Sequence, residues 1–469
     1  MWQRLVLTAG TEAQNLIFRE QLSLIPTDEY CETIEVVTDE SSGIRIGSGG
    51  ATLSIIRRIL QQKDGDRGKI LLIHSGGLSQ RMPHLSAYGK AFGMLPNGKT
   101  LLETKLEIYK KYLYEKLPST GGIMISASDV LENMEEFSKS SDVSDVLIFS
   151  HPSSLEVGTQ HGVFVMNERN ELKKVLQKPS KEEMIREEAV QTDGSVLTDS
   201  CYFMTWKFCE RLLEHKLLRE PVTEELCCYG DFMRPMGTDP KLDYIQKCAS
   251  PRLAAYRKVL ADVFRTADVQ ITVLGLNSFF HFGTYSEFLE HLDPKSDFRK
   301  SFPLLFESNV IRSSGFQNVP MTSFVEFSTG ALVEVGSGSF VSGVDAENLK
   351  VTIPDKAVVF TMSLKSKEYV TVIVNIDEDI KGKSERVTWN GHDTGIRGKT
   401  MWEAPIFGVY ETRAKSLEGT LREWKNGISD KVVKRVSISG AVVEHDLGAD
   451  LERRRQLIHL KTGNDIVIE

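Results

Sequence analysis

The sequence predicts an α/β domain over residues 1–297, followed by a β-rich domain over residues 298–469. In the first part, short β-branched runs alternate with amphipathic stretches, which is the pattern of a mostly parallel sheet covered by helices. After about residue 298 this helical periodicity fades, and short apolar steps separated by Gly and Ser take over, as in "SFVEFSTGALVEVGSGSFVSG". The composition, 41% hydrophobic and 26% charged over 469 residues, leaves room for two or three globular domains.

The α/β part reads as an ordered series of strands and helices. The expected strands are "RLVLTAG", "CETIEVVT", "KILLIHSGG", "GGIMISASD" and "SDVLIF". The expected helices between them are "NLIFREQLSLI", "ATLSIIRRILQQ" and "TKLEIYKKYLYEKL". In such sheets ligands bind at the carboxyl ends of the strands. The sequence therefore predicts a site near "SGG" at 75–77 and "SASD" at 126–129.

The β-rich part has apolar residues that recur six positions apart. The pairs are Val319 with Val325, Val335 with Val341, and Ile353 with Val359. Six-residue stepping is typical of the coils of a left-handed β-helix. The stepping is interrupted between the pairs, so an irregular β-sandwich is the alternative that the pattern leaves open.

Charge and composition exclude several classes of protein. The formal net charge of −8 argues against a nucleic-acid binder that works through a broad basic face. The first residues, "MWQRLVLTAG", have no long apolar segment, and no apolar stretch approaches the length that crosses a bilayer. The six cysteines show no paired CxxC spacing, which indicates reduced thiols. We expect a soluble cytoplasmic protein with no membrane and no nucleic-acid partner.

The stretch "HSGGLSQRMPHLSAYGK" at 74–90 has the residue types that bind a phosphate. Adjacent glycines let main-chain N–H groups approach an anion closely. Arg81 supplies a planar fork and Lys90 a point charge, both suited to a polyphosphate. An ordinary glycine turn beside a solvated basic residue is the alternative. Neither GxGxxG nor GxxxxGK[ST] is present, which argues against hydride transfer and ATPase chemistry.

The loop resembles the signature of sugar-phosphate nucleotidyltransferases, and further blocks narrow the resemblance to the fucose-1-phosphate guanylyltransferase (GDP-fucose pyrophosphorylase) family. The blocks, in the family's order over residues 47–292, are "GSGGATL", "ILLIHSGGLSQR", "SAYGKAF", "HPSSLEVGTQHGVFV", "QKPS", "TDSCYFM", "YGDF" and "FFHFGTYSEFLEHL". Weaker similarity to the family continues as far as "MWEAPIF" at 401–407. The sequence shows no kinase-type glycine-serine phosphate loop of the kind found in bifunctional members of the family, so we expect a single activity.

The six-residue stepping favours a left-handed β-helix for the second domain, and the resemblance implies that a Rossmann-like nucleotidyltransferase (GT-A-like) domain precedes it. The same resemblance implies one magnesium-dependent reaction, in which GTP and L-fucose 1-phosphate give GDP-L-fucose and pyrophosphate by in-line attack of the sugar phosphate on the α-phosphate. Two alternatives stay open. One is another hexose-1-phosphate nucleotidyltransferase, and the other is a catalytically silent subunit that binds a GDP-sugar. Base preference independent of the resemblance, oligomeric state and the role of the carboxyl-terminal domain stay undetermined.

The resemblance also implies roles for individual residues. Arg81 would contact the leaving pyrophosphate, Lys90 would neutralise charge on the α-phosphate, and Lys178, held extended before Pro179, would meet the sugar phosphate. The residues implied in nucleotide binding are Gly49, Gly50, Thr52, Gly76, Gly77 and Ser79. Those implied in sugar-phosphate binding are Gly162, Lys178, Asp199, Tyr229, Asp231 and His281. For the Gly49 turn the alternative is a tight strand-to-helix turn, and for Asp199, Tyr229 and Asp231 it is a turn or cap.

Asp129 ends the strand "GGIMISASD", where the superfamily commonly has an aspartate that binds Mg²⁺. A cap of a following helix through "SDVLENMEEF" is the alternative role. The superfamily often supplies a second carboxylate two residues before a Gly-Thr pair, but in "HFGT" that position is His281. Because Mg²⁺ prefers oxygen ligands, the second ligand is left open, with Asp199 and Asp231 as alternatives.

Overall fold

A computed structural model of the protein describes residues 1–39, 44–62, 67–138, 143–248, 250–306, 308–346, 349–430, 432 and 434–458. The chain divides into two compact units. Unit 1 is Met1–Gly76 with Leu102–Phe280, and unit 2 is Gly77–Leu101 with His281–Glu469. The predicted boundary after residue 297 instead falls inside helix α12, Asp297–Ser301. Residues 77–101 join unit 2 because they bond to it, for example where Ser308 N–H donates to the Pro96 carbonyl.

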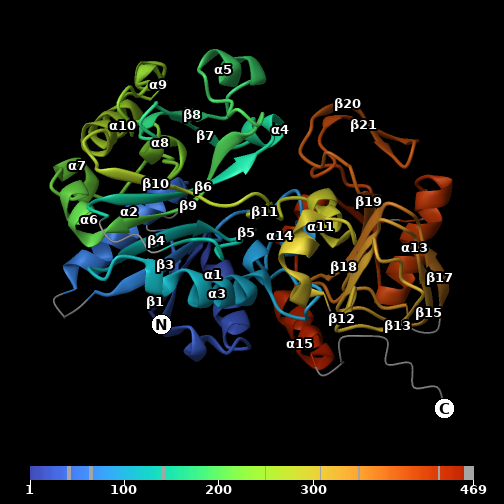
Figure 1. The fold of residues 1–469 in the computed structure, drawn as a ribbon. Coiled ribbons are helices and arrows are strands. Elements are labelled where there is room, and N and C mark those ends of the chain that lie inside the picture. The colour runs from blue at the N-terminus through green and yellow to red at the C-terminus, as the bar shows by residue number, and fades with distance from the viewer. Residues whose placement is uncertain are drawn as a thin grey trace. The chain divides into compact units, whose positions relative to one another are not determined.

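Unit 1 has the α/β organisation that the sequence predicts (Figure 1). Its strands are β1 (Trp2–Ala9), β2 (Cys31–Thr38), β3 (Lys69–His74), β4 (Gly122–Ala127), β5 (Val130–Glu132), β6 (Val146–Ser153), β7 (Gly162–Met166), β8 (Leu172–Gln177), β9 (Val196–Thr205), β10 (Val269–Val273) and β11 (Phe279–His281). Its main sheet has the order β10-β6-β9-β4-β3-β1-β2. β1, β2, β3 and β4 pair in parallel, and β9 runs antiparallel to β4 and β6. The α/β alternation is therefore confirmed, but the sheet is mixed rather than mostly parallel, because β9 pairs antiparallel with β4, β6 and β7, and β7 pairs antiparallel with β8.

Helices cover both faces of this sheet. They are α1 (Glu12–Leu22), α2 (Gly47–Gln61), α3 (Leu101–Tyr112), α4 (Leu155–Gly158), α5 (Lys181–Arg186), α6 (Trp206–Leu212), α7 (Lys216–Arg219), α8 (Gly230–Met233), α9 (Asp243–Gln246) and α10 (Pro251–Phe264). Alternate strand residues such as Ile123 and Ile125 join one hydrophobic cluster with α2, α6, α8 and α10. Ser126, on the opposite face of β4, contacts Lys105 of α3. A sheet buried on both faces explains the continuous apolar strands.

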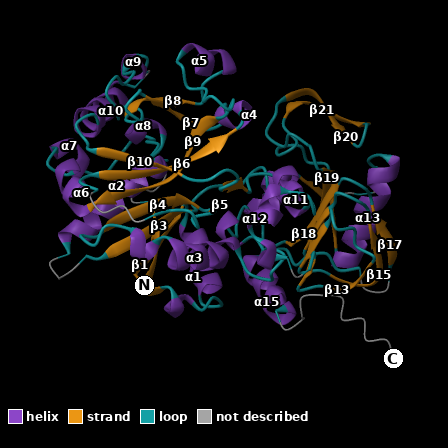
Figure 2. Cartoon of the chain, viewed as in Figure 1, coloured by secondary structure: helices purple, strands orange, loops and turns teal. Residues whose placement is uncertain are grey.

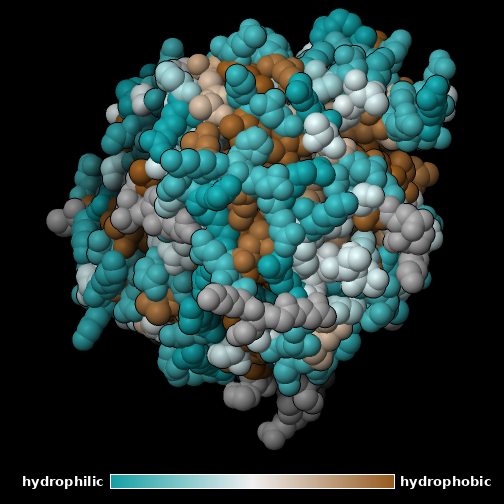
Figure 3. Space-filling model, turned by 90° about the vertical axis from the view of Figure 1, so that its left-hand side faces the viewer, coloured by the Kyte–Doolittle hydropathy of each residue, from teal (hydrophilic) through white to brown (hydrophobic). Residues whose placement is uncertain are grey.

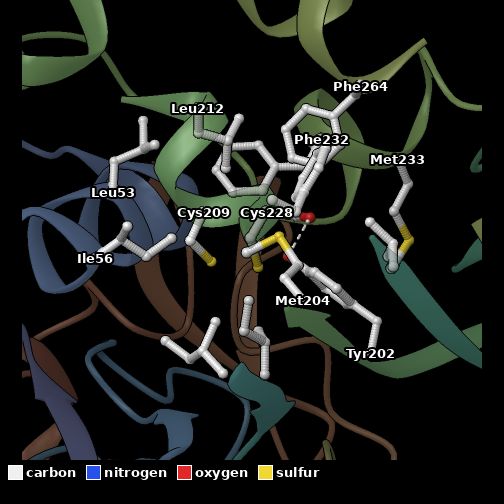
Figure 4. Packing of buried hydrophobic residues seen from close by; sticks show 14 of the residues in the cluster. Leu53, Ile56, Tyr202, Met204, Cys209, Leu212, Cys228, Phe232, Met233 and Phe264 are labelled. Atoms are coloured by element: carbon white, nitrogen blue, oxygen red, sulfur yellow. Dashed lines mark hydrogen bonds between the residues drawn. The ribbon is translucent and has the colours of Figure 1, made fainter. Parts of the chain in front are cut away.

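The cluster on the first face is a tightly packed core (Figure 4). Leu53 of α2 and Leu212 of α6 point toward Met204 from β9 and Phe264 of α10. Tyr202 is also buried there, and its hydroxyl donates to the Cys228 carbonyl at 2.9 Å, so its one polar atom is satisfied. This core fixes the central strands whose ends carry the candidate site.

Unit 2 is built mainly of β-strands (Figure 2). Its strands are β12 (Val310–Ile311), β13 (Ser314–Gln317), β14 (Phe324–Glu326), β15 (Thr329–Val335), β16 (Phe340–Ser342), β17 (Lys350–Ile353), β18 (Ala357–Ser363), β19 (Tyr369–Asn375), β20 (Ser384–Trp389), β21 (His392–Lys399), β22 (Phe407–Tyr410) and β23 (Arg435–Val436). Its helices are α11 (Tyr285–Leu292), α12, α13 (Arg413–Asn426), α14 (Ile438–Val443) and α15 (Leu447–Leu457). One sheet has the order β12-β14-β16-β18-β19-β22-β23 and another β13-β15-β17.

The first strands of unit 2 stack in parallel, as the coils of a solenoid do. Val325 pairs with Val341, which pairs with Val359, along the longer sheet. Val335 pairs with Ile353 in the three-stranded sheet. Each six-residue step from Val335 to Val341 and from Ile353 to Val359 therefore carries the chain from one sheet to the other. Parallel stacking of this kind differs from the antiparallel pairing of a β-sandwich, and antiparallel pairing begins only between β18 and β19.

Among the described residues, none of the helices is long and apolar enough to cross a membrane. The face of the molecule shown in Figure 3 is mostly hydrophilic, and its hydrophobic side chains form small, separated patches. Scattered patches of this size are ordinary on a protein surface.

Candidate functional site

In unit 1, the predicted site residues from several strands lie at one edge of the main sheet. β1, β3 and β4 run in the same direction, so their carboxyl ends, at Ala9, His74 and Ala127, meet at that edge. β9 runs the other way, and its first residues lie beside the end of β6, where Asp199 pairs with Ser150. This is the edge at which ligands bind in open α/β sheets.

The two adjacent glycines after β3 have different environments. Ser75 and Gly76 donate their N–H groups to the Thr8 hydroxyl at 3.1 and 3.3 Å. A Cβ atom on Gly76 would lie 2.8 Å from the Gly10 nitrogen, so the close approach of β1 and β3 requires glycine there. A Cβ atom on Gly77 would meet nothing within 4 Å. Packing thus explains Gly76 but not Gly77.

The second glycine turn, "GSGGATL", is the start of α2, and its groups are engaged within unit 1. Gly49 N–H donates to the Leu226 carbonyl at 2.8 Å, and a Cβ atom on Gly50 would lie 2.8 Å from Ile46 Cβ. The Thr52 hydroxyl donates to Ser48 O at 2.8 Å and lies 3.0 Å from His74 Nε2. These contacts favour the alternative of a tightly packed helix start over nucleotide contacts from Gly49 and Gly50.

The structure brings Gly162 and Lys178 together at the open end of the β7–β8 hairpin. Gly162 pairs with Gln177, and Lys178 N–H donates to the His161 carbonyl at 3.0 Å. The expected extended conformation of Lys178 is wrong, because its φ is +48°. The left-handed conformation turns the chain sharply before Pro179 and leaves the lysine side chain exposed.

Asp199 supports this hairpin end from β9. Its Oδ1 accepts the Gly162 N–H at 3.1 Å and lies 3.6 Å from His161 Nδ1. A Cβ atom on Gly162 would lie 2.6 Å from Asp199 Oδ2, so glycine is required beside the carboxylate. The arrangement places a buried carboxylate, a histidine and an exposed lysine at one end of a hairpin.

Tyr229 and Asp231 are engaged in the fold. The Tyr229 hydroxyl donates to the Ser200 carbonyl at 2.8 Å. Both oxygens of the buried Asp231 are used, one by Cys227 N–H at 2.7 Å and one by Arg257 Nε at 2.7 Å. These bonds favour a role for Asp231 as a turn residue over a role in sugar binding. Because both carboxylate oxygens are used, the same bonds also argue against Asp231 as the second metal ligand.

Asp129 lies half-buried in the turn that follows β4. The helix expected after it is absent, because Val130–Glu132 form strand β5. The alternative role as a helix cap is therefore wrong. Within the described ranges, no cluster of three His, Cys, Asp or Glu side chains could hold a metal ion. Mg²⁺ often takes one protein carboxylate together with phosphates and waters, and a single half-buried aspartate at the strand ends fits that donor set.

Two clusters of buried polar side chains near the carboxyl ends of the strands, one around Lys105 and one around His151, were not predicted from the sequence. Lys105 Nζ donates to Glu132 Oε2 at 2.8 Å and to Ser126 Oγ at 2.7 Å. His151 lies inside β6, and its ring nitrogens bond to Ser278 and Ser200 at 2.7 and 2.6 Å. Burial lowers the pKa of His151 to about 3. Lys105 itself could have indicated the first cluster, because it is a charged residue on the face of α3 that is otherwise apolar.

In unit 2, the loop 77–101 carries the predicted cations. Ser79 has a φ of +43°, and its carbonyl accepts the Met82 N–H at 2.8 Å, so the exposed Arg81 lies inside a tight turn over residues 79–82. Two short 3-10 helices follow, Pro83–Leu85 and Lys90–Phe92. The half-buried Lys90 donates from Nζ to the Gly283 carbonyl at 3.1 Å.

His281 of "HFGT" also lies in unit 2, where its Nδ1 is 3.0 Å from Glu287 Oε1. Burial alone would raise the pKa of Glu287, but the His281 hydrogen bond and charge, with the Thr284 hydroxyl, lower it to about 2. The carboxylate is therefore ionised at neutral pH and engaged by neighbouring donors. Glu287 lies outside the residues that the sequence singled out.

Fold and site together define an α/β protein with glycine turns, a carboxylate and a hairpin lysine at its strand ends, and a basic loop in a β-rich unit. Residues 64–412 match the model of the fucose pyrophosphorylase domain family. The match spans more than half of the chain, so the chain belongs to this family, and the resemblance is confirmed.

Named relatives agree with this assignment. A fucose-1-phosphate guanylyltransferase of Homo sapiens is 28% identical over 555 residues, covering 97% of this chain and 90% of the relative. The corresponding protein of Mus musculus is 28% identical and covers 81% of this chain and 75% of the relative. An L-fucokinase/L-fucose-1-P guanylyltransferase of Bacteroides fragilis is 24% identical over 78% of this chain and 39% of its own length.

Proposed function

We propose that the protein transfers a guanylyl group from GTP to L-fucose 1-phosphate, giving GDP-L-fucose and pyrophosphate. The observation that carries the proposal is the similarity, over 97% of this chain, to a relative named for that activity. The strand-end site of unit 1 and the basic loop of unit 2 supply residue types that the reaction needs. No covalent intermediate with the enzyme is required, because the sugar phosphate oxygen attacks the α-phosphorus directly.

The physical problem of the reaction is that two anions must meet. In the proposed roles, Arg81 binds the oxygens of the departing pyrophosphate, and Lys90 neutralises charge that develops on the α-phosphate. Preorganised cations aimed at developing charge lower the barrier more than cations that bind substrate and transition state equally. The open space at Gly77, followed by the Ser79 turn, supports a backbone contact to the triphosphate.

The sugar phosphate is proposed to bind at the β7–β8 hairpin end. Lys178 is exposed there and offers its ammonium group to the phosphate. Gly162 lets the Asp199 carboxylate approach the backbone, and Asp199 holds the glycine N–H and faces His161 beside the proposed phosphate position. Contacts of Tyr229 with fucose hydroxyls are proposed through the ring edge and the hydroxyl lone pair, because the hydroxyl proton is already donated to Ser200.

Magnesium is the proposed cofactor, with Asp129 as its protein ligand. Bound Mg²⁺ would neutralise phosphate charge and help pyrophosphate to leave. The half-buried carboxylate at the end of β4 and the preference of Mg²⁺ for one or two carboxylates plus phosphates support this assignment. His281 is engaged with Glu287, which supports a metal bound without His281.

Two further proposals concern the protein as a whole. The stacked coils of unit 2 are proposed to form a left-handed β-helix, since six-residue steps connect successive strands. A high-resolution experimental structure would give the hand directly. The protein is proposed to work in the cytoplasm, which fluorescence microscopy of a tagged chain would test.

The function is tested by following GDP-fucose formation from GTP and fucose 1-phosphate with purified protein. Asp129→Asn should lower turnover by at least about a hundred-fold, the size expected for a lost electrostatic contact to the transition state. Asp262→Asn, a change of an exposed aspartate on α10, is the matched control and should leave turnover unchanged. A wild-type protein that forms no GDP-fucose with Mg²⁺ present would refute the proposal.

A further inference from the structure

Lys90 reaches a defined partner within unit 2. Its ammonium nitrogen lies 3.1 Å from the Gly283 carbonyl oxygen, across 193 positions of the sequence. A lysine side chain has four carbons joined by rotatable bonds, and it loses much conformational freedom when its ammonium group is fixed. The Gly283 carbonyl therefore helps to fix the position of the Lys90 ammonium group, provided that the peptide carrying this carbonyl is itself held in place.

Glu287 holds that peptide from the opposite side. Its Oε2 accepts the Gly283 N–H at 3.1 Å and the Thr284 hydroxyl at 3.0 Å, while Oε1 lies 3.0 Å from His281 Nδ1. Glu287 N–H in turn donates to the Thr284 hydroxyl at 3.2 Å. This is a variant of the capping box at the start of α11, because Glu287 accepts the N–H of Gly283, one residue before the N-cap Thr284, and also contacts His281, so one carboxylate orders the turn.

The His281 ring also packs against the turn. A Cβ atom on Gly283 would lie 2.0 Å from Cε1 of the His281 ring, so the ring packs directly on the glycine. The His281 carbonyl is close to His291 Nε2, at 2.9 Å, which attaches the turn to the end of α11. His281 thus has a physical role at the position where an aspartate was expected, because it binds the carboxylate of Glu287.

The same turn contacts the loop at a second point. The Tyr285 hydroxyl lies 2.6 Å from His84 Nδ1, and the two rings stack with centroids 5.2 Å apart. Both residues are buried. His84 lies six positions before Lys90, so residues 283–285 hold the loop at two places.

We infer that Glu287 is a positioning residue for Lys90, acting through the Gly283 peptide, and that the turn 281–287 of unit 2 holds the loop for the reaction. The inference rests on the proposed function, in which Lys90 stabilises the α-phosphate. Glu287 does not touch the reacting atoms. Its contribution is to fix an ammonium group whose displacement by an ångström is costly to the rate.

The test uses Glu287→Gln in the full-length protein. The amide has nearly the shape of the carboxylate, but it has one acceptor oxygen in place of two, so the three donors around it are no longer all satisfied. The turnover number should fall about ten- to a hundred-fold while KM for GTP changes little, as expected when a catalytic group is misplaced. Glu290→Gln, an exposed glutamate on the same helix, is the matched control and should retain wild-type turnover.

A double-mutant cycle separates positioning from a merely structural role. In a Lys90→Gln protein, adding Glu287→Gln should cause no further loss of turnover, because the group being positioned is gone. Melting temperatures of all variants should stay within a few degrees of wild type. A full additional loss in the Lys90→Gln background, or a tenfold loss that accompanies global unfolding, would overturn the inference.

A readout without turnover keeps the inference separate from the proposed function. The rate at which acetic anhydride labels Lys90, relative to exposed Lys110, can be measured by mass spectrometry in the absence of substrates. Glu287→Gln should raise that rate about three-fold, the equivalent of one modest hydrogen bond, and Glu290→Gln should not. An unchanged labelling rate would refute the inference even if GDP-fucose is formed, whereas a raised rate in a protein that forms no GDP-fucose would refute only the function.

Discussion

Replacing Lys105 by methionine should destabilise unit 1 strongly. The Lys105 side chain is 1% exposed and its partner Glu132 is fully buried, with Nζ and Oε2 2.8 Å apart. Lys105→Met removes the ammonium charge and the hydrogen bonds that it donates to Glu132 and Ser126. Glu132 Oε1 already has no hydrogen-bond partner among the described residues, so the variant would retain a buried carboxylate with only the Tyr109 hydroxyl, at 2.9 Å, as a donor.

The expected cost is set by the charge left behind. Removing one member of a buried ion pair costs about 3–5 kcal/mol, because an uncompensated charge stays in the interior. Replacing both members by apolar residues of similar size avoids that penalty, so Lys105→Met with Glu132→Leu should recover most of the loss. Lys110→Met, an exposed change on the same helix, should stay within about 0.5 kcal/mol of wild type.

Urea unfolding followed by circular dichroism gives these free energies. The Lys105→Met midpoint should fall without a change in the slope with urea, which would show that stability and not compactness has changed. A loss below about 1 kcal/mol, or a double variant as unstable as Lys105→Met alone, would show that the pair is not the buried ion pair described. The result bears on function, since Ser126 and Glu132 flank the turn that carries Asp129.

Three further predictions use other parts of the molecule. Gly76→Ala should lower the melting temperature, whereas Gly77→Ala should preserve it and raise KM for GTP; equal melting temperatures would contradict the packing difference at the two positions. Lys90→Ala and Arg81→Ala should each lower turnover by about a hundred-fold or more at unchanged melting temperature, measured as GDP-fucose formed, and near-normal turnover would remove both from the reaction. Wild type should be more stable than His151→Asn at pH 7, and this difference in unfolding free energy should shrink by about 2 kcal/mol at pH 5. The reason is that the buried ring stays neutral in the folded protein, whereas the histidine of the unfolded chain gains a proton below pH 6.5. Urea unfolding at both pH values measures the difference, and a constant value would contradict the lowered pKa of His151.

The local pattern of the sequence was sufficient to predict the α/β part and the strand ends. Runs such as "KILLIH" before "SGG" indicate a buried strand and a change of chain direction, and the structure has β3 followed by a bend at Gly77. The stepping from Val335 to Val341 likewise indicated stacked strands. Such predictions succeed because burial on one or both faces imposes a period that neighbouring residues share.

Contacts between residues far apart in the sequence could not be predicted in the same way. The sequence around "SDVLENMEEF" is compatible with a helix, but Val130–Glu132 form β5 and pair with β11. The assignment of residues 77–101 to unit 2 depends on bonds such as that of Lys90 to Gly283. Lys178 combines a left-handed φ with an N–H bond to the His161 carbonyl across the hairpin, and neither feature is visible in the local sequence pattern.

The measurement that tests the account most directly is pyrophosphate release by the purified protein with Mg²⁺, compared across fucose 1-phosphate, mannose 1-phosphate, glucose 1-phosphate and no sugar, with GTP and then with UTP. We expect release with fucose 1-phosphate and GTP that exceeds every other pair and disappears when Mg²⁺ is chelated. Preferred release with another sugar phosphate or with UTP, or no release from any pair despite measurable binding of GDP-fucose, would contradict it.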